Sequence, residues 1–300
     1  MNPINSKPPS GFLPWQPAAW LHVSGSDAFT FLQGQFTNEL KHASPHGVYG
    51  LWLSLKGKVL GDSFIVADAG PNEFWIGSYH TEAATLRARL ESFVIADDVV
   101  VEDATSDWMA VSVTGSDAVA TVERGRATTA GGFTFSGRRT RPANVEWVFR
   151  REAEPAVRAS LAGLRKWDEN EMEAMRIGAG IPSVPADIGP NDLPNEGGME
   201  LEAISYTKGC YLGQEVMARL KSMGKVRRRL LRVRGRGDEV PARGSAFFAG
   251  GRQVGELRSA VRDGEGFIGL AMISLINLAG NTALSVGVEA GPEIQLLECE

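Results

Sequence analysis

Cysteine is nearly absent from this sequence, which has only Cys210 and Cys299 among its 300 residues. So few thiols exclude a disulfide-stapled scaffold and fit a reducing compartment. Cys210 has no CxxC partner, and Cys299 stands beside the C-terminus, where chains commonly fray. We therefore expect no intramolecular disulfide.

An excess of positive charge, long apolar runs and the features of a signal peptide are lacking as well. The formal net charge of -5 argues against a general nucleic-acid coat protein, because such proteins carry a basic excess. No apolar run approaches the length that spans a bilayer, and the proline-rich first residues lack the apolar core of a signal peptide. Because 43% of the residues are hydrophobic, the chain can bury a sizeable core. We expect a soluble, cytoplasmic, globular protein with no membrane partner.

Metal and nucleotide motifs are missing too. His42 and His46 have helical spacing, but Ser44 and Pro45 break the helix that would align them. No zinc-type cluster is evident, so we predict no metal site. A phosphate-binding GxxxxGK[ST] loop, a Rossmann glycine fingerprint and a GxSxG elbow are absent.

A strand-to-helix junction occurs twice in the sequence. Residues 18–34 predict a short strand and a helix, with Ser26 or Asp27 as the helix cap. The same Gly-Ser-Asp-Ala letters follow a valine-rich strand at 115–118. A duplicated α+β module and the recurrence of a common cap chemistry explain this echo equally well.

Hairpin and helix patterns fill the region between and after these junctions. Residues 48–68 predict a hairpin that turns at 56–58, and residues 155–180 predict a helical region. An apolar helical stripe with Thr81 as its cap is formed by Leu86, Leu90 and Phe93. The loop at 181–198 is dense in Pro, Gly, Asn and Asp, and long irregular loops are often functional.

The C-terminal part has a different pattern. Residues 213–224 predict a helix that ends at Gly224. Short β-type runs follow at turn-rich intervals, which is typical of a barrel or sandwich. We predict a region at 1–225 made of two interleaved α+β subdomains, with an insertion at roughly 48–105, and a β domain at 226–300.

Cys210 lies between a Lys-Gly pair and the expected helix start. A thiol is a nucleophile or metal ligand only as thiolate, which a nearby cation or helix N-terminus stabilises. Lys208 supplies the cation, and Gly213 stands where the helix begins. The alternative is that Cys210 is a small buried hydrophobe, the usual fate of a free cysteine.

A basic run occupies residues 219–236 of this acidic chain. It is either a solvated charged surface between two domains or an anion site for a polycarboxylate, a phosphate or an RNA backbone. No aromatic residue interrupts the run, which disfavours binding of single-stranded nucleic acid.

Several motifs together resemble one protein family. YTKGCYLGQEVMARL, at 206–220, resembles the KGC-aromatic-x-GQE signature of the YgfZ-type folate-binding proteins, which are paralogues of the glycine-cleavage T-protein (aminomethyltransferase). Residues 25–40 resemble the family's GxDAxxFLQGxxTNDV segment, and residues 55–62 its P-x-G-[RK]-x-x-x-D hairpin. MRIGAGIP and KVRRRL resemble its R-I-E-A-G-I-P motif and its terminal basic strand. The matches keep their order over most of the chain.

The resemblance implies an α+β, T-protein-like fold: two interlocked α+β domains around a central folate-binding channel, plus a C-terminal β-barrel. It implies a role in the assembly or repair of iron–sulfur enzymes, including tRNA-modifying ones. Tetrahydrofolate or a one-carbon derivative would be the cofactor, and iron–sulfur client proteins the partners, with an indirect link to tRNA.

The resemblance also assigns site residues. It makes Cys210 the key reactive residue, with Lys208 beside it, and Glu196 the carboxylate that binds the pterin, since a carboxylate can accept two N–H bonds. The other residues expected to bind the cofactor or border the channel are Gln33, Thr37, Asn38, Tyr211, Gln214, Glu215 and Arg219.

Two departures from the family pattern bear on activity. Gly178 replaces the glutamate of R-I-E-A-G, which would loosen pterin binding. Ala84 stands about where T-proteins carry the aspartate needed for aminomethyl transfer, so the transfer would lose its acid–base partner. We therefore favour the accessory role over two alternatives, an aminomethyltransferase and a non-catalytic folate- or RNA-binding module.

Overall fold

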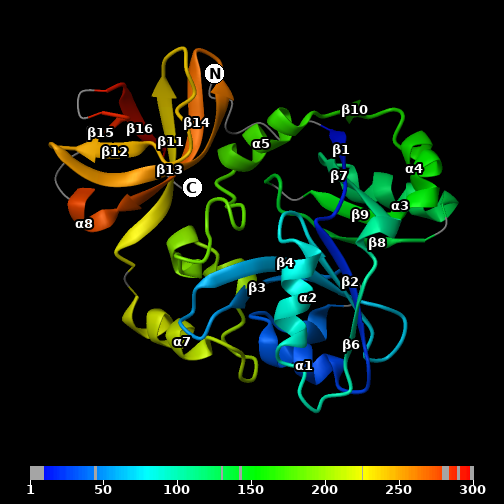
Figure 1. Cartoon of the computed structure of the whole chain (residues 1–300). Helices are drawn as coiled ribbons and strands as arrows, with labels where there is room; N and C mark the ends of the chain where they lie inside the picture. The colour runs from blue at the N-terminus through cyan, green and yellow to red at the C-terminus, as the bar shows by residue number, and fades with distance from the viewer. Residues whose placement is uncertain are drawn as a thin grey trace.

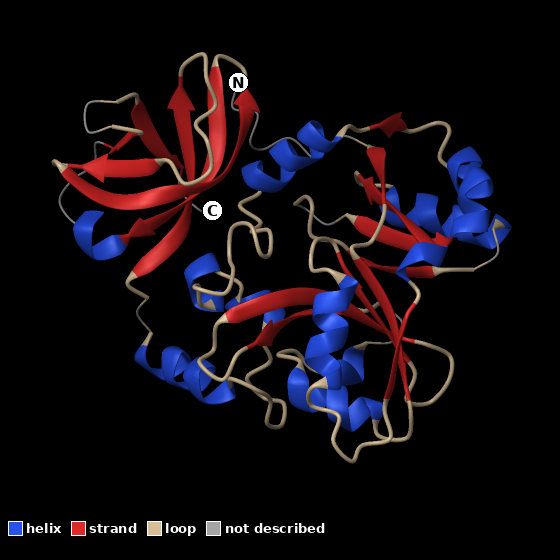
Figure 2. Cartoon of the chain, in the orientation of Figure 1, coloured by secondary structure: helices blue, strands red, loops and turns tan. Residues whose placement is uncertain are grey.

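Three sheets, one in each of three lobes, organise the computed structural model (Figures 1 and 2). Two lobes combine helices with a sheet, and the third is built almost wholly of strands. The structure describes residues 10–43, 46–129, 131–141, 144–224, 226–278, 284–288 and 291–297. None of the described helices is long and apolar enough to cross a membrane.

The lower lobe of Figure 1 is a five-stranded antiparallel sheet in the order β3-β4-β5-β2-β6. Its strands are β2 (Ala19–Ser24), β3 (Val48–Leu53), β4 (Val59–Ala67), β5 (Phe74–Ser78) and β6 (Val100–Asp103). The helices of this lobe are α1 (Ala28–Gln35) and α2 (Ala83–Glu91), with the 3-10 turn η2 (Leu40–His42). Apolar side chains from both helices and from the sheet, including Leu32, Leu86 and Ile76, share one core. The predicted hairpin with its turn at 56–58 joins β3 to β4, and Gly57 has the positive φ of 70° that suits glycine.

The second α+β lobe has a sheet in the order β10-β1-β7-β9-β8, in which only β10 and β1 pair in parallel. Its strands are β1 (Gly11–Trp15), β7 (Trp108–Thr114), β8 (Phe133–Ser136), β9 (Val145–Arg150) and β10 (Arg165–Lys166). Its helices and turns are η3 (Thr105–Asp107), α3 (Ala118–Thr128), η4 (Arg151–Ala153), α4 (Glu154–Ser160) and α5 (Glu169–Gly178). The chain leaves this sheet after β1, builds the whole of the first sheet, and returns at β7. The two α+β lobes are therefore interlocked, as predicted.

An aromatic cluster joins the two sheets. Trp20 and Trp75 of one sheet pack with Trp108 and Phe135 of the other. The rings of Trp20 and Phe135 stack with centroids 6.4 Å apart. Because buried aromatic side chains contribute large apolar areas, this contact fixes the position of one sheet against the other.

The repeated Gly-Ser-Asp junctions occupy matching places, between β2 and α1 and between β7 and α3. Gly25 and Gly115 both have positive φ, at 123° and 103°. This common placement favours a duplicated module. The expected cap chemistry is wrong, however: among the described residues Asp27 makes no side-chain cap bond, and its carboxylate instead accepts from the backbone N–H of Asp98 at 2.8 Å.

Two helix predictions need correction. The region at 155–180 is not one helix, because α4 and α5 are separated by strand β10, and Asp168 starts α5 with a capping box. Helix α2 ends before Phe93, which is 38% exposed. Thr81 is buried and donates to Asp62 rather than capping that helix.

The third lobe is a closed barrel in the order β11-β14-β13-β12-β15-β16, which confirms the predicted C-terminal β-barrel. Its elements are β11 (Arg228–Arg236), β12 (Ala246–Ala249), β13 (Arg252–Asp263), β14 (Gly266–Ser274), α8 (Leu275–Leu278), β15 (Leu284–Val286) and β16 (Glu293–Leu297). Phe247, Leu257 and Phe267 are among the side chains that fill its interior. Closure leaves no free sheet edge in this lobe.

The segment between α5 and the barrel carries the motif around Cys210. It contains η5 (Pro194–Gly197), α6 (Glu200–Ala203) and α7 (Gln214–Met223). Helix α7 begins after Gly213, with φ 86°, and ends at Gly224, with φ 65°, as predicted. We call residues 205–213, between α6 and α7, the signature loop.

Candidate functional site

The signature loop packs against the end of the N-terminal motif at 25–40. The Oγ1 of Thr37 donates to the carbonyl of Ala203 at 2.6 Å, and the N–H of Ser205 donates to the carbonyl of Thr37 at 3.0 Å. The N–H of Leu212 reaches the carbonyl of Gly34 at 3.1 Å. The two motifs that carried the resemblance, about 170 residues apart, are thus held together by backbone hydrogen bonds.

Lys208 anchors the loop. Its Nζ donates to the carbonyl oxygens of Phe36 at 2.6 Å and Asn38 at 2.8 Å, and the residue is only 7% exposed. Burial lowers the pKa of Lys208 to about 8, although Glu39 partly opposes this. The side chain therefore points into the protein and fastens the loop to the neighbouring segment. This anchoring differs from the expected task of Lys208, which was to stabilise a thiolate at Cys210.

Cys210 is exposed at the tip of the anchored loop. A side-chain carbon added at the adjacent Gly209 would meet no described atom within 4 Å, so the surroundings are open. The alternative that Cys210 is a buried hydrophobe is wrong. At Gly213, by contrast, an added carbon would lie 2.7 Å from the carbonyl oxygen of Ser54, so glycine is required where α7 begins.

The other predicted residues of the motif spread over two environments. Tyr211 is 6% exposed, its hydroxyl has no hydrogen-bond partner among the described residues, and burial raises its pKa to about 12. Gln214 is half-buried at the start of α7, whereas Glu215 and Arg219 are exposed. The side chain of Gln33, outside this motif, forms a hydrogen bond within its own segment: its Nε2 donates to Glu39 at 2.7 Å.

Glu196 is buried, but a protein cation already binds it. Its carboxylate accepts from the N–H of Leu193 at 2.7 Å and from the Nε of Arg228 at 2.8 Å. Arg228 lies at the start of β11, so the pair ties the loop at 181–198 to the barrel. A pterin that used this carboxylate would have to displace Arg228.

The basic run at 219–236 contains both cations that bond within the protein and cations that face solvent. Arg228, Arg232 and Arg234 make hydrogen bonds within the protein, to Glu196, to the carbonyl of Gly178 and to Asp263. Among the described residues of the run, the other cations, which face solvent, are Arg219, Lys221, Arg227, Arg229 and Arg236. The exposed part is thus smaller than the sequence alone indicates.

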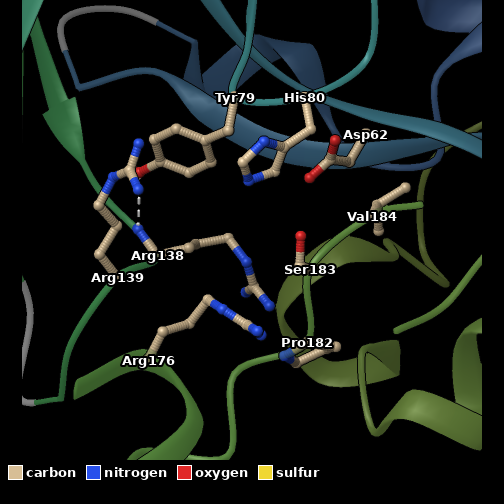
Figure 3. Close-up of a pocket in the computed structure, with 9 residues that line it drawn as sticks. All are labelled: Asp62, Tyr79, His80, Arg138, Arg139, Arg176, Pro182, Ser183 and Val184. Atoms are coloured by element: carbon tan, nitrogen blue, oxygen red, sulfur yellow. Dashed lines mark hydrogen bonds between the residues drawn. The ribbon is translucent and has the colours of Figure 1, made fainter. Parts of the chain in front are cut away.

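A small cavity, called the central cavity here, lies where the two interlocked lobes meet the 181–198 loop (Figure 3). It admits the centres of water-sized molecules over about 20 Å³, which is room for a water or two. None of the residues predicted to bind the cofactor lines it. Its lining comes from five separate segments: Asp62, Tyr79, His80, Arg138, Arg139, Arg176, Pro182, Ser183 and Val184.

Each arginine of the central cavity has a carboxylate partner. Arg138 donates to Glu202, Arg139 lies 4.0 Å from Glu146, and Arg176 donates to Asp187 at 2.7 Å. Hydrogen bonds to these carboxylates position the guanidinium groups of Arg138 and Arg176, whereas the Nε of Arg139 has no hydrogen-bond partner among the described residues. Asp187 and Glu146 have side chains with no exposed area, so both depend on such partners.

Asp62 is the carboxylate that lines the cavity itself. It accepts from the hydroxyls of Tyr49 at 3.0 Å, Ser78 at 3.2 Å and Thr81 at 3.3 Å. Burial raises the pKa of Asp62, although these hydrogen bonds and Arg138 oppose the shift. A carboxyl group in such surroundings can take up and release a proton nearer to neutral pH.

Ala84 does not bear on this cavity, because it is exposed on α2. The expectation that aminomethyl transfer lacks the aspartate at position 84 stays a prediction, and the cavity carries a carboxyl group of its own in Asp62. The signal that could have found the group was the final aspartate of the 55–62 hairpin motif, which is Asp62.

Asn38 connects the signature loop to the cavity. Its carbonyl accepts from Lys208, and its side-chain amide donates to the carbonyls of Tyr49 at 2.8 Å and Glu202 at 3.0 Å. The side chains of those two residues bond in turn to Asp62 and Arg138. Asn38, Tyr49 and Glu202 therefore connect the anchor of the signature loop to two residues of the cavity wall, through hydrogen bonds made by their backbones and by their side chains.

Comparison with known proteins agrees with this architecture. Residues 15–145 match the GCVT N-terminal domain, and residues 227–295 match the CAF17 C-terminal beta-barrel domain. The glycine cleavage system aminomethyltransferase T from Bartonella henselae superposes with a TM-score of 0.79 over 97% of this chain and 86% of its own, at 14% identity. The chain thus combines a GCVT-like N-terminal domain with a CAF17-like C-terminal barrel, which is consistent with a YgfZ-type paralogue of the T-protein.

Curated relatives extend the likeness along the sequence. The mitochondrial iron-sulfur cluster assembly factor IBA57 of Homo sapiens is 28% identical over 296 residues, spanning 92% of this chain and 80% of that protein. The tRNA-modifying protein YgfZ of Yersinia pestis (strain Pestoides F) is 32% identical over 136 residues, spanning 43% of this chain and 41% of that protein. The predicted T-protein-like fold is confirmed.

Proposed function

We propose that this protein is a folate-dependent accessory factor for the assembly or repair of iron–sulfur enzymes, including tRNA-modifying ones, and that it acts through Cys210 in the cytoplasm. The observation that carries the proposal is the exposed thiol on a loop anchored by the buried Lys208. Because the loop is already anchored, little conformational entropy is lost when a partner binds to the sulfur.

The proposal draws its client class from the relatives. IBA57 is an iron-sulfur cluster assembly factor and YgfZ a tRNA-modifying protein, and both share sequence with this chain. A thiolate is a soft ligand that suits iron. One exposed cysteine cannot hold a cluster alone, so cluster or iron would be shared with a client protein, and the thiol proton would pass to solvent as the iron–sulfur bond forms.

Tetrahydrofolate, or a one-carbon derivative, is the proposed cofactor, and the central cavity its proposed site. The cavity offers guanidinium donors and the proton-exchanging carboxyl of Asp62. At about 20 Å³ it is much smaller than the hundreds of Å³ of typical ligand pockets. Folate binding would therefore require the long side chains of the lining, such as Arg138 and Arg176, to move outward.

A second candidate function is folate-dependent one-carbon transfer of the aminomethyltransferase type. One observation favours it: Asp62, the cavity carboxyl with a raised pKa, is placed to exchange a proton with a bound amine. Turnover of aminomethyl groups on tetrahydrofolate by the purified protein, lost in Asp62→Asn and kept in Cys210→Ser, would establish this activity instead.

The thiol proposal is tested by replacing the sulfur with oxygen. In a strain that lacks the protein, we expect Cys210→Ser to abolish the rescue of iron–sulfur enzyme activity. Tetrahydrofolate affinity should stay within about 2-fold of the wild-type value, because the cavity lies outside the signature loop. Full rescue by Cys210→Ser would show that the thiol is not used. A folded variant that loses folate affinity as well would contradict the separation of the two sites.

A further inference from the structure

A cluster of histidine and carboxylate side chains stands at one end of the β3-β4-β5-β2-β6 sheet. One ligand-type atom from each of His22, Asp68 and Glu73 lies within 4.8 Å of the other two, and all three residues are half-buried. None of them lines the central cavity or belongs to the signature loop. The proposed function does not use them.

Strand pairing brings these residues together from distant parts of the sequence. His22 on β2 pairs with Trp75 on β5 and, on its other side, with Glu102 on β6. Asp68 and Glu73 face each other across the turn from β4 to β5, where the N–H of Asp68 donates to the carbonyl of Glu73 at 2.8 Å. The cluster is therefore a product of sheet register, which the linear sequence conceals.

Neighbouring groups orient two of the three side chains. The indole N–H of Trp75 donates to Oδ2 of Asp68 at 2.7 Å, and the rings of His22 and Trp75 lie 4.7 Å apart. The Nε2 of His22 faces Glu73 at 3.9 Å, while its Nδ1 faces Glu102 at 3.6 Å. An imidazole with carboxylates on both sides matches the arrangement in which one nitrogen binds metal and the other is held by an outer acceptor.

We propose that His22 Nε2 and the carboxylates of Asp68 and Glu73 bind a divalent transition-metal ion, with water completing its coordination. The imidazole ligand favours zinc, iron, cobalt or manganese over calcium and magnesium, which prefer all-oxygen sites. Bond lengths of about 2.0–2.1 Å require ligand atoms roughly 3.3 Å apart in a tetrahedral site. The ligand atoms all lie within 4.8 Å of one another, so they must move closer together when the metal binds.

The proposal is tested by titrating the full-length, metal-stripped protein with Zn²⁺ by calorimetry and with Co²⁺ by visible absorption. We expect about one equivalent to bind at this site, with d–d bands of a nitrogen–oxygen Co²⁺ complex. His22→Gln should weaken binding at least about 100-fold. Glu102→Gln, which removes only the outer acceptor, should weaken it by about 10- to 100-fold.

Further variants keep the result interpretable. Glu73→Gln removes a ligand whose side chain is 43% exposed, so it tests the site without disturbing the half-buried His22. Glu91→Gln, which lies outside the cluster, should bind the metal as the wild type does. The proposal is overturned if the wild-type protein binds no metal. It is overturned equally if His22→Gln and Glu73→Gln, with wild-type circular dichroism, bind it unchanged.

Discussion

The signature loop and the central cavity both depend on buried cations, but they neutralise them differently. In the loop, the ammonium of Lys208 donates to two neutral backbone carbonyls, and burial lowers its pKa to about 8 although Glu39 partly opposes this. In the cavity, Arg138, Arg139 and Arg176 each meet a carboxylate. The difference indicates two tasks: the cavity keeps a charged lining paired with acidic residues, while the loop exposes one thiol and keeps its anchor inside.

The largest expected effect comes from breaking a cavity ion pair. Asp187→Asn removes the charge of the fully buried carboxylate that binds Arg176, because the Asp187 side chain has no exposed area. Loss of one partner of such a pair costs about 3–5 kcal/mol, which denaturant unfolding will measure.

A matched control uses the same guanidinium. Glu173 also binds Arg176, but its side chain is 39% exposed. Glu173→Gln should therefore cost no more than about 1 kcal/mol. If both variants lost the same free energy of unfolding, the buried ion pair would be no more important for stability than the exposed one, and the comparison would fail.

The second-largest effect is expected from Asp62→Asn, which should change both tetrahydrofolate affinity and the pH dependence of stability. Asp62→Asn should weaken tetrahydrofolate at least about 10-fold in calorimetry, because a charged hydrogen-bond acceptor is lost. Burial raises the pKa of Asp62, so the folded protein binds more protons than the unfolded chain, and wild-type stability falls as pH rises from 3.8 through that raised pKa. The variant should lack this fall.

Asp97→Asn is the control for that experiment, since Asp97 is exposed. It should leave both folate affinity and the pH dependence unchanged. If Asp62→Asn binds tetrahydrofolate as tightly as the wild type, the central cavity is not the folate site.

The third effect tests the anchor of the loop. Because the pKa of Lys208 is lowered from 10.5 to about 8, the unfolded chain binds more protons between these values. Wild-type stability should therefore gain from this residue as pH rises from about 8 to 10.5. Lys208→Met should flatten that part of the profile, and the exposed Lys56→Met should not. An identical slope in wild type and Lys208→Met would mean that the ammonium is not buried.

The smallest effect is expected from the exposed basic residues. Reversing Arg227 and Arg229 to Glu, both exposed at the start of the barrel, should change iron–sulfur enzyme rescue by less than about 2-fold. Surface charges away from a site contribute little. A loss as complete as that of Cys210→Ser would favour the RNA-binding alternative.

Local patterns predicted some of the elements described here. The turn at 56–58, the helix ending at Gly224 and the β-rich C-terminal domain follow from glycine placement and short strand runs. The helical region predicted at 155–180 is divided into two helices, because the strand pairing of Arg165 and Lys166 overrides local helix propensity between them. The interlocking of the two lobes came only from the family resemblance, since strand order is a long-range property.

The sequence predicted the residues of the candidate site that lie in continuous motifs, but not the residues that line the cavity. Cys210 and the segment at 33–38 stand in continuous motifs, and the structure brings them together. The cavity escaped notice because His80, Arg139 and Arg176 come from separate segments without a shared motif. Carboxylates that position the arginines, such as Glu146, carry no sequence signal beyond an acidic residue inside a buried strand.

The central claim is that the thiol of Cys210 is accessible in the folded protein and is linked to a folate site through Lys208 and Asn38. The most direct measurement is the rate of Cys210 alkylation in the native protein, taken across pH with and without saturating tetrahydrofolate. We predict rapid alkylation without unfolding, and a rate that changes when tetrahydrofolate binds. Alkylation limited by global unfolding, or a rate unaffected by bound folate, would contradict this account.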